Sequence, residues 1–190
     1  MLLVAGFART MAPYDPYVGD YGQQFVRPNV DHWFGTDEFG RDILSRIMYG
    51  ARIALFVGFA ASFAGCTIGL LLGVTSAYIG GKLDLLLERL MDILLAFPQL
   101  ILALAIASIL GPAVQNVVIA IAIPIIPRAA RVVRAAALSV KEFPYVEAAQ
   151  ALGAKRKRVI LQHIVPNTLA PYIILLTAQG TVDTAVEAVK

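Results

Sequence analysis

Residues 145–166 read YVEAAQALGAKRKRVILQHIVP, a short basic segment that lies between two long apolar runs. Charged side chains are costly to place in the hydrocarbon core of a membrane, so this segment belongs at one face of a bilayer. The apolar runs on either side of it belong inside the bilayer. The sequence therefore predicts an all-α, multi-pass membrane protein.

Composition and charge support this class. Of the 190 residues, 58% are hydrophobic, whereas soluble domains have about 45–50%, and the mean hydropathy is +0.73. The formal net charge of +3 is unevenly distributed, since residues 128–163 contain eight Lys or Arg and only two Glu. Lys and Arg in short loops mark the cytoplasmic face, so this basic segment is predicted to lie in the cytoplasm.

The first long apolar run covers residues 53–81 and contains no charged side chain. At about 1.5 Å per residue it is longer than the roughly 30 Å hydrocarbon core. Alanine and glycine are common in membrane helices, but small residues at every fourth position favour a face for close helix packing. The small residues in this row are Ala61, Gly65, Gly69, Gly73 and Ala77.

Further apolar runs predict further spans. Residues 93–127 lack charges, and the Gly111-Pro112 pair within them is a turn signal that divides the run into two helices. A last apolar run of about 14 residues is a marginal span. The expected elements are a short charged hinge at 82–92, helices at about 93–110 and 113–127, and the last span at 169–182.

The N-terminal part is polar and is expected to form an extended extracytoplasmic loop over residues 8–52. Thr36 and Asp37 are good N-cap types, and the next helix is predicted to begin near them. Residues 1–7 are apolar but too short to cross a bilayer, and we interpret them as the end of a partial first helix. The predicted organisation is a partial helix and loop at 1–52, a transmembrane domain at 53–182 with a cytoplasmic loop at 128–163, and a polar tail at 183–190.

The cytoplasmic loop is predicted to contain a short exposed helix of about two turns. Pro144 suits the first turn of a helix, and Gly153 suits its C-terminal end. Glu147 lies in the first turn, where negative charge complements the helix dipole. Three alanines give the helix a thin surface, and a second helix is expected at 155–163. Two interpretations remain open: the thin helix docks into a partner protein, or the basic loop is only an orientation signal.

The spacing in this loop resembles the EAA loop of ABC-transporter permease subunits, of the importer type that depends on a binding protein. One position departs mildly from the general pattern, because His163 stands where an apolar residue is often found. This departure is similar to the variant of the peptide and nickel branch. The residues that carry the resemblance are Glu147, Ala148, Ala149, Gly153, Val165 and Pro166.

A second segment, HWFGTDEFGRD at residues 32–42, is similar to the GTD-x-x-GRD segment of C-type subunits in the dipeptide, oligopeptide and nickel branch. Residues 92–98 (DILLAFP) and 127–134 also resemble that group. The resemblance covers roughly residues 10–178. Members of the family have a complete first helix and a further helix after the fifth, so the chain is expected to be truncated at both ends.

The resemblance implies a polytopic helical bundle of the ABC importer permease (MetI-like) type, with about four clear spans and a partial N-terminal helix, in a prokaryotic inner membrane. It implies a non-enzymatic subunit that forms half of a pathway for peptides, nickel or a similar small solute. The implied partners are a second permease contacted through the small-residue face, two cytoplasmic ATPases that bind ATP and Mg²⁺, an extracytoplasmic solute-binding protein and membrane lipid. The implied ATPase-docking residues are Tyr145, Glu147, Ala148, Ala149, Gly153 and Pro166.

Other classes of function find less support in the residues. The chain has no P-loop pattern, and it offers no set of residues for catalysis, a cofactor or a metal. Cys66 lies in an apolar run and is predicted to be a small apolar filler, while His32 and His163 are predicted to be structural. Nucleic-acid binding is not expected, because the KRKR run at 155–158 adjoins apolar spans and lipid phosphates are the nearer anions.

Two alternatives without an ATPase remain open, a secondary transporter and a passive membrane scaffold. A secondary transporter is expected to carry ionisable groups within its spans for ion coupling, and residues 53–81 and 93–127 carry none. Co-purification separates these classes, because only an ATP-driven importer predicts a stoichiometric ATPase partner. The residues do not distinguish among peptides, nickel and other solutes.

Overall fold

A computed structural model of the chain describes residues 11–187, with side chains described as far as residue 177. The chain divides into two compact units, Met1–Val57 and Gly58–Lys190. The described residues form helices and loops without a β-strand, apart from one isolated antiparallel bridge between Thr36 and Asp42. The all-α class is thus confirmed, whereas the predicted partial helix at 1–7 lies outside the described residues.

Unit 1 consists of a folded loop, a short 3-10 helix η1 (Tyr21–Gln23) and the start of helix α3 (Ile43–Ile79), which continues into unit 2. The prediction that this helix begins near Thr36 or Asp37 is wrong. Thr36 is instead buried in the loop, where its backbone N–H donates to the carbonyl oxygen of Val26 at 3.1 Å. Asp42 precedes the helix, and its Oδ2 accepts a hydrogen bond of 2.8 Å from the Ser45 N–H, as an N-cap residue does.

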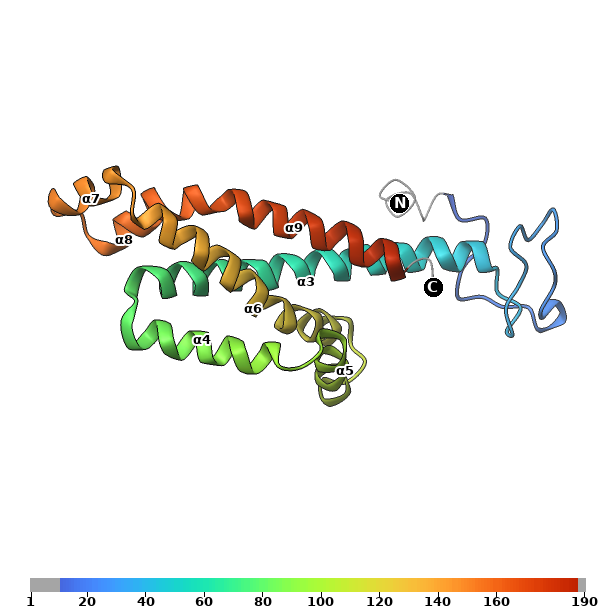
Figure 1. The fold of residues 1–190 in the computed structure, drawn as a ribbon. Helices are drawn as coiled ribbons and strands as arrows, with labels where there is room; N and C mark the ends of the chain where they lie inside the picture. Colours follow the sequence, from blue (N-terminus) through green and yellow to red (C-terminus); the bar gives the residue numbers. More distant parts are fainter. Residues whose placement is uncertain (1–10, 188–190) are drawn as a thin grey trace. The chain divides into compact units, whose positions relative to one another are not determined.

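Unit 2 is a bundle in which α6 has the central place. This helix contacts α4, α5 and α9 and also packs along α3, and ten of its residues are buried (Figure 1). The elements of unit 2 after α3 are α4 (Gly81–Leu95), α5 (Gln99–Leu110), α6 (Val114–Lys141), α7 (Pro144–Ala151), α8 (Arg156–Val159), the π-helix η2 (Ile160–Ile164) and α9 (Val165–Glu187).

The charged segment at 82–92 is not a hinge, because it lies within the regular helix α4. Its acidic residues recur at every fourth position and share one face of that helix. The hinge lies after it, where α4 and α5 are bent by 89°. The predicted turn at Gly111-Pro112 is confirmed, and Gly111 has a φ of +88° that suits glycine.

The helices after this turn are longer than expected. The predicted helix 113–127 continues as α6 to Lys141, through three arginines, with Pro124 and Pro127 inside it. The expected second helix at 155–163 does not stand alone, because α8, η2 and α9 follow one another without a break.

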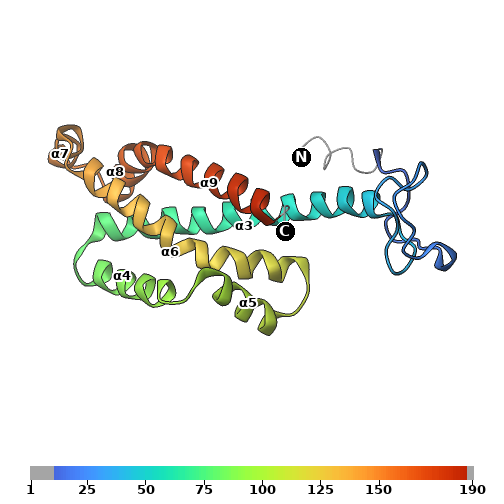
Figure 2. The ribbon, with the colours of Figure 1, turned by 45° about the vertical axis from the view of Figure 1, so that its right-hand side comes forward.

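Three helices are long and apolar enough to cross a membrane, and the bent pair α4–α5 makes up to four. The three are Ile43–Ile79, Val114–Lys141 and Arg156–Thr177. This agrees with the prediction of about four spans. Within unit 2, the views in Figures 1 and 2 both place α7 and α8 at the same end as the α3–α4 turn, whereas α5 lies toward the other end.

Candidate functional site: an exposed helix anchored to the membrane bundle

Helix α7 is a short helix with a defined start and a defined end. Pro144 occupies its first turn, and Glu147 supplies the acidic residue there. At the other end Gly153 has a φ of +79°, which suits glycine. The Gly153 N–H donates to the Gln150 oxygen at 2.9 Å and the Ala154 N–H donates to the Ala149 oxygen at 3.0 Å, the pattern of a Schellman motif. The secondary structure predicted here from proline and glycine is therefore present.

One side chain fixes α7 to the bundle. Val146 is 0% exposed and belongs to an apolar cluster that also contains Val140 of α6, Val159 of α8 and Ile164 of η2. The opposite surface faces outward: Glu147 and Ala148 are exposed, and Leu152 just after the helix is 89% exposed. The helix therefore presents a free surface while its inner side is packed into the core.

The predicted docking residues lie on two neighbouring elements. Tyr145, Glu147, Ala148 and Ala149 lie on α7, and Gly153 follows it. Pro166 lies at the start of α9 and is exposed. The ring of Tyr145 is 5.9 Å from the ring of His163 in η2, so α7 is held beside the segment that leads to Pro166.

Pro166 accounts for the wide turn that precedes it. Proline has no N–H for the carbonyl four residues earlier, and its ring crowds that carbonyl. The Val165 N–H donates to the oxygen of Ile160, five residues earlier, and so forms a π-helical turn. Asn167 and Thr168 then donate side-chain hydrogen bonds to the oxygens of His163 and Val165, at 2.6 and 2.9 Å.

The row of small residues on α3 lies against α6. A Cβ added at Gly69 would be 2.5 Å from the Cβ of Ala129, and one added at Gly73 would be 2.5 Å from the oxygen of Ala130. Gly65 is similarly close to α6, and Ala61 and Ala77 at the ends of the row are buried. The partner of this face is α6 of the same chain and not the second permease that the sequence suggested, which is a correction.

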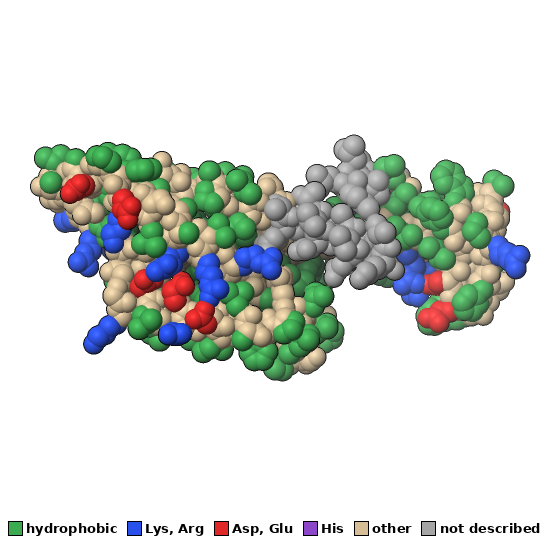
Figure 3. Space-filling model, in the orientation of Figure 1, with side chains coloured by type: hydrophobic (Ala, Val, Ile, Leu, Met, Phe, Trp, Pro, Cys, Tyr) green, Lys and Arg blue, Asp and Glu red, His purple; other side chains and the backbone are tan. Residues whose placement is uncertain are grey.

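Ion pairs join α4 to α6 on another side of α6. The guanidinium of Arg134 binds both carboxylate oxygens of Asp84, each at 2.7 Å, and approaches Glu88 at 3.6 Å. Arg131, about one turn earlier on α6, pairs with Asp92, about two turns later on α4. Charged side chains gather over α4 and α6 in Figure 3. This ladder of ion pairs was not predicted from the sequence. The signal for it is the four-residue spacing of the acidic residues on α4 together with the three-residue spacing of the arginines on α6.

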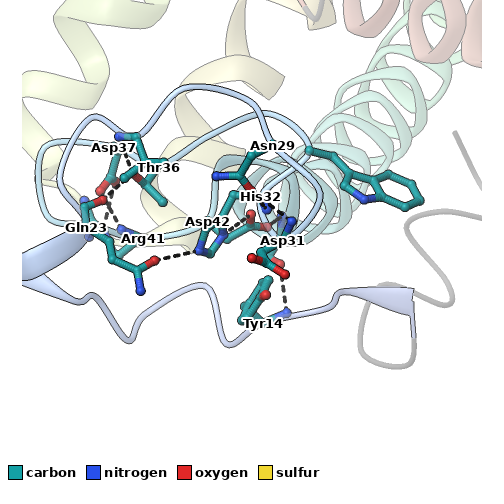
Figure 4. Close-up of polar contacts among 12 residues, drawn as sticks. Tyr14, Gln23, Asn29, Asp31, His32, Thr36, Asp37, Arg41 and Asp42 are labelled. Atoms are coloured by element: carbon teal, nitrogen blue, oxygen red, sulfur yellow. Dashed lines mark hydrogen bonds and ion pairs between the residues drawn. The ribbon is translucent and has the colours of Figure 1, made fainter.

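In unit 1, the segment at 32–42 folds into a tightly hydrogen-bonded loop (Figure 4). The carboxylate of Asp37 accepts hydrogen bonds from the backbone N–H groups of Phe39 and Arg41, at 2.8 and 3.0 Å, and from the Arg41 guanidinium at 2.9 Å. His32 bridges two side chains, with Nδ1 3.0 Å from Asp42 and Nε2 3.0 Å from Gln23. His32 thus connects Asp42 and Gln23 within the loop.

The Asp42 carboxylate predicts a pH dependence for this loop. Burial raises its pKa, but hydrogen bonds from Ser45 and His32 outweigh burial, and the pKa is lowered from 3.8. A carboxyl with a lowered pKa stabilises the fold above its unfolded pKa, and this stability is lost as the pH falls through the lowered value. We expect the fluorescence of the single tryptophan, Trp33, to be constant from neutral pH to about pH 4 and to change only below it. Asp42→Asn should remove this acid transition and Asp31→Asn should keep it; an unaltered transition in Asp42→Asn would contradict the assignment.

Comparison with known proteins finds a matching family and several relatives that are all named as parts of transport systems. Residues 65–181 match the family model "binding-protein-dependent transport system inner membrane component". The chain is 44% identical over 176 residues to the dipeptide transport system permease protein DppC of Alkalihalophilus pseudofirmus, covering 93% of this chain and 58% of that protein. It is 40% identical over 181 residues to a putative peptide transport system permease protein of Brucella suis, covering 93% and 61%. It is 42% identical over 178 residues to the glutathione transport system permease protein GsiD of Escherichia coli, covering 93% and 59%.

The chain thus spans about three fifths of the length of these relatives, between 58% and 61%. The family match and the relatives agree with the helical architecture and with the family that the sequence resembles. This chain belongs to the family of binding-protein-dependent transport system inner membrane components.

Proposed function

We propose that this chain forms half of the translocation pathway of an ATP-driven importer for short peptides in the cytoplasmic membrane. The similar proteins are named for dipeptides, peptides and glutathione, which share a peptide backbone and at least one carboxylate. A second permease would complete the pathway. An extracytoplasmic binding protein would deliver the peptide, and two cytoplasmic ATPases would bind ATP and Mg²⁺.

The observation that carries this proposal is the way α7 is attached to the bundle. Its outer surface is exposed, whereas Val146 on its inner side is buried with residues of α6, α8 and η2. An ATPase that holds α7 in a groove would therefore move α6 and α9 with it, because interiors this closely packed transmit strain. In this mechanism Tyr145, Glu147, Ala148 and Ala149 contact the ATPase, and Gly153 and Pro166 define the shape of the contact surface.

Site-directed cross-linking tests this proposal in the assembled transporter. Cys66 is buried, so a cysteine introduced at an exposed position is the reactive one. We expect Ala148→Cys to cross-link to a co-purifying ATP-binding subunit in native membranes. Ile109→Cys is the matched control, because it is 84% exposed on α5, away from α7. Peptide uptake driven by an ion gradient, with no ATPase in the purified complex, would contradict the proposal.

A further inference from the structure

Four consecutive cations form a turn whose charge is not compensated within the described chain. This basic turn consists of Lys155, Arg156, Lys157 and Arg158, and all four are exposed. None of the ion pairs found among the described residues includes any of them. Among the described residues, Arg158 Nε donates a hydrogen bond of 2.9 Å to the neutral Gln162 Oε1, which leaves the positive charge available.

Three other cations of unit 2, Arg131, Arg134 and Lys141, are engaged within the fold. Arg131 and Arg134 bind the carboxylates of α4. Lys141 donates to the carbonyl oxygens of Ala77 and Tyr78 at the end of α3, at 3.3 and 3.4 Å. Only some of the Lys and Arg side chains of residues 128–163 are therefore free to bind an external anion. The basic turn has the highest density of such side chains.

The basic turn begins a helix that can cross the membrane. The segment Arg156–Thr177 is long and apolar enough to do so, which places the cations at the level of the lipid headgroups. Leu161 follows about one turn later and is 66% exposed, and Ile173 further along is 53% exposed. Cations followed by exposed apolar side chains match the two parts of a phospholipid, its phosphate and its acyl chains.

We propose that the basic turn binds the headgroup phosphates of anionic phospholipids. Basic clusters next to a spanning helix attract anionic lipid with about 1 kcal/mol per cation. Arg156, Lys157 and Arg158 open α8 and are each rotated by about 100° from the residue before, while Lys155 precedes them as the N-cap residue with an extended backbone. The four charges therefore do not share one face of the helix. Lipids surround a helix at the interface, whereas a protein cleft contacts one face. The acidic surface of an ATPase is therefore the weaker candidate.

Bound lipid would also act on the bundle. Val159 follows the basic turn directly and is 0% exposed, within the same apolar cluster as Val146. Lipid that holds the basic turn at the headgroup level thus restrains the segment that leads from α7 to α9. Anionic lipid should then stabilise the complex against heat more than a zwitterionic lipid does.

The test uses the whole complex in nanodiscs of phosphatidylcholine, with or without phosphatidylglycerol. Native mass spectrometry counts retained phosphatidylglycerol, and a thermal scan measures the transition temperature. We expect each removed cation to lower the apparent affinity for phosphatidylglycerol about fivefold. The variant K155Q/R156Q/K157Q/R158Q should lose retention and the lipid-dependent stabilisation, whereas the charge-preserving control K155R/K157R should keep both.

Two results would overturn the proposal. The first is equal retention of phosphatidylglycerol by the wild type and the glutamine variant, with both equally stable in pure phosphatidylcholine. The second is loss of the ATPase from the glutamine variant with lipid retention unchanged, which would assign the basic turn to a protein contact. A variant that fails to assemble is replaced by the single changes Lys155→Gln and Lys157→Gln, whose unchanged retention would have the same meaning.

Discussion

Gly69→Leu is expected to prevent assembly of the helical bundle and has the largest predicted effect on stability. A Cβ at this position already lies 2.5 Å from the Cβ of Ala129 and 2.9 Å from the backbone nitrogen of Ala130. These atoms belong to the backbone or are attached directly to it, so α6 cannot yield by a rotamer change. Overpacking costs about 1–3 kcal/mol in ordinary cores, and a whole side chain between two helices should exceed that range.

The measurement is the thermal unfolding of the purified chain in detergent, together with its yield in the membrane. Gly69→Ala should show a smaller loss in the same direction. Gly50→Ala is the matched control, since it lies on the same helix with nothing within 4 Å of the added Cβ. It should raise stability by about 0.5–1 kcal/mol, because alanine loses less entropy than glycine in a helix. Equal stability of Gly69→Leu and wild type would show that α3 and α6 do not pack in this way.

Gly153→Val is expected to give the largest loss of transport. Gly153 has a φ of +79°, a conformation that costs a side chain with a Cβ about 1–2 kcal/mol. No atom lies within 4 Å of the added Cβ, so the cost comes from the backbone and stays at the end of α7. One to two kcal/mol corresponds to a factor of about 5–30 in a conformational population. ATP-driven peptide uptake should fall by a factor in that range.

Uptake, ATP hydrolysis and thermal stability should be measured together in proteoliposomes. ATP hydrolysis should become less dependent on peptide, while the unfolding temperature of the bundle stays near that of the wild type. Gly153→Asn tests the cause, because asparagine adopts this conformation more readily than valine and should retain most of the uptake. Full uptake by Gly153→Val would argue against a role of α7 in coupling.

Local signals in the sequence were sufficient for α7. Pro144 and Gly153 act through their own backbones, so they determine the ends of a helix wherever it packs. The start of α3 was not predicted, because Thr36, Asp37 and Asp42 are all N-cap types. Contacts between residues distant in sequence determine which of them precedes the helix. The hydroxyl of Thr36 accepts a hydrogen bond of 2.9 Å from the Val26 N–H, and this contact holds Thr36 in the loop.

The interior of the bundle was predicted only in part for a related reason. The spacing of the small residues on α3 indicates a face for close packing, but it does not name the helix that fills it. The charges of α4 suggested a hinge when taken alone, because their partners, Arg131 and Arg134, lie about forty to fifty residues later in the chain. The spacing of residues within one segment indicates which face of a helix is packed. Only the tertiary structure shows which helix lies against that face.

The continuity of α6 from Val114 to Lys141 has a mechanical consequence. Its 28 residues extend over about 42 Å, which is longer than the roughly 30 Å of a hydrocarbon core. Rotating such a rod by about 10° around one end displaces the other end by about 7 Å, more than the rise of one helical turn. In the proposed importer, the helix would thus act as a lever arm that converts a small angular change into a large displacement.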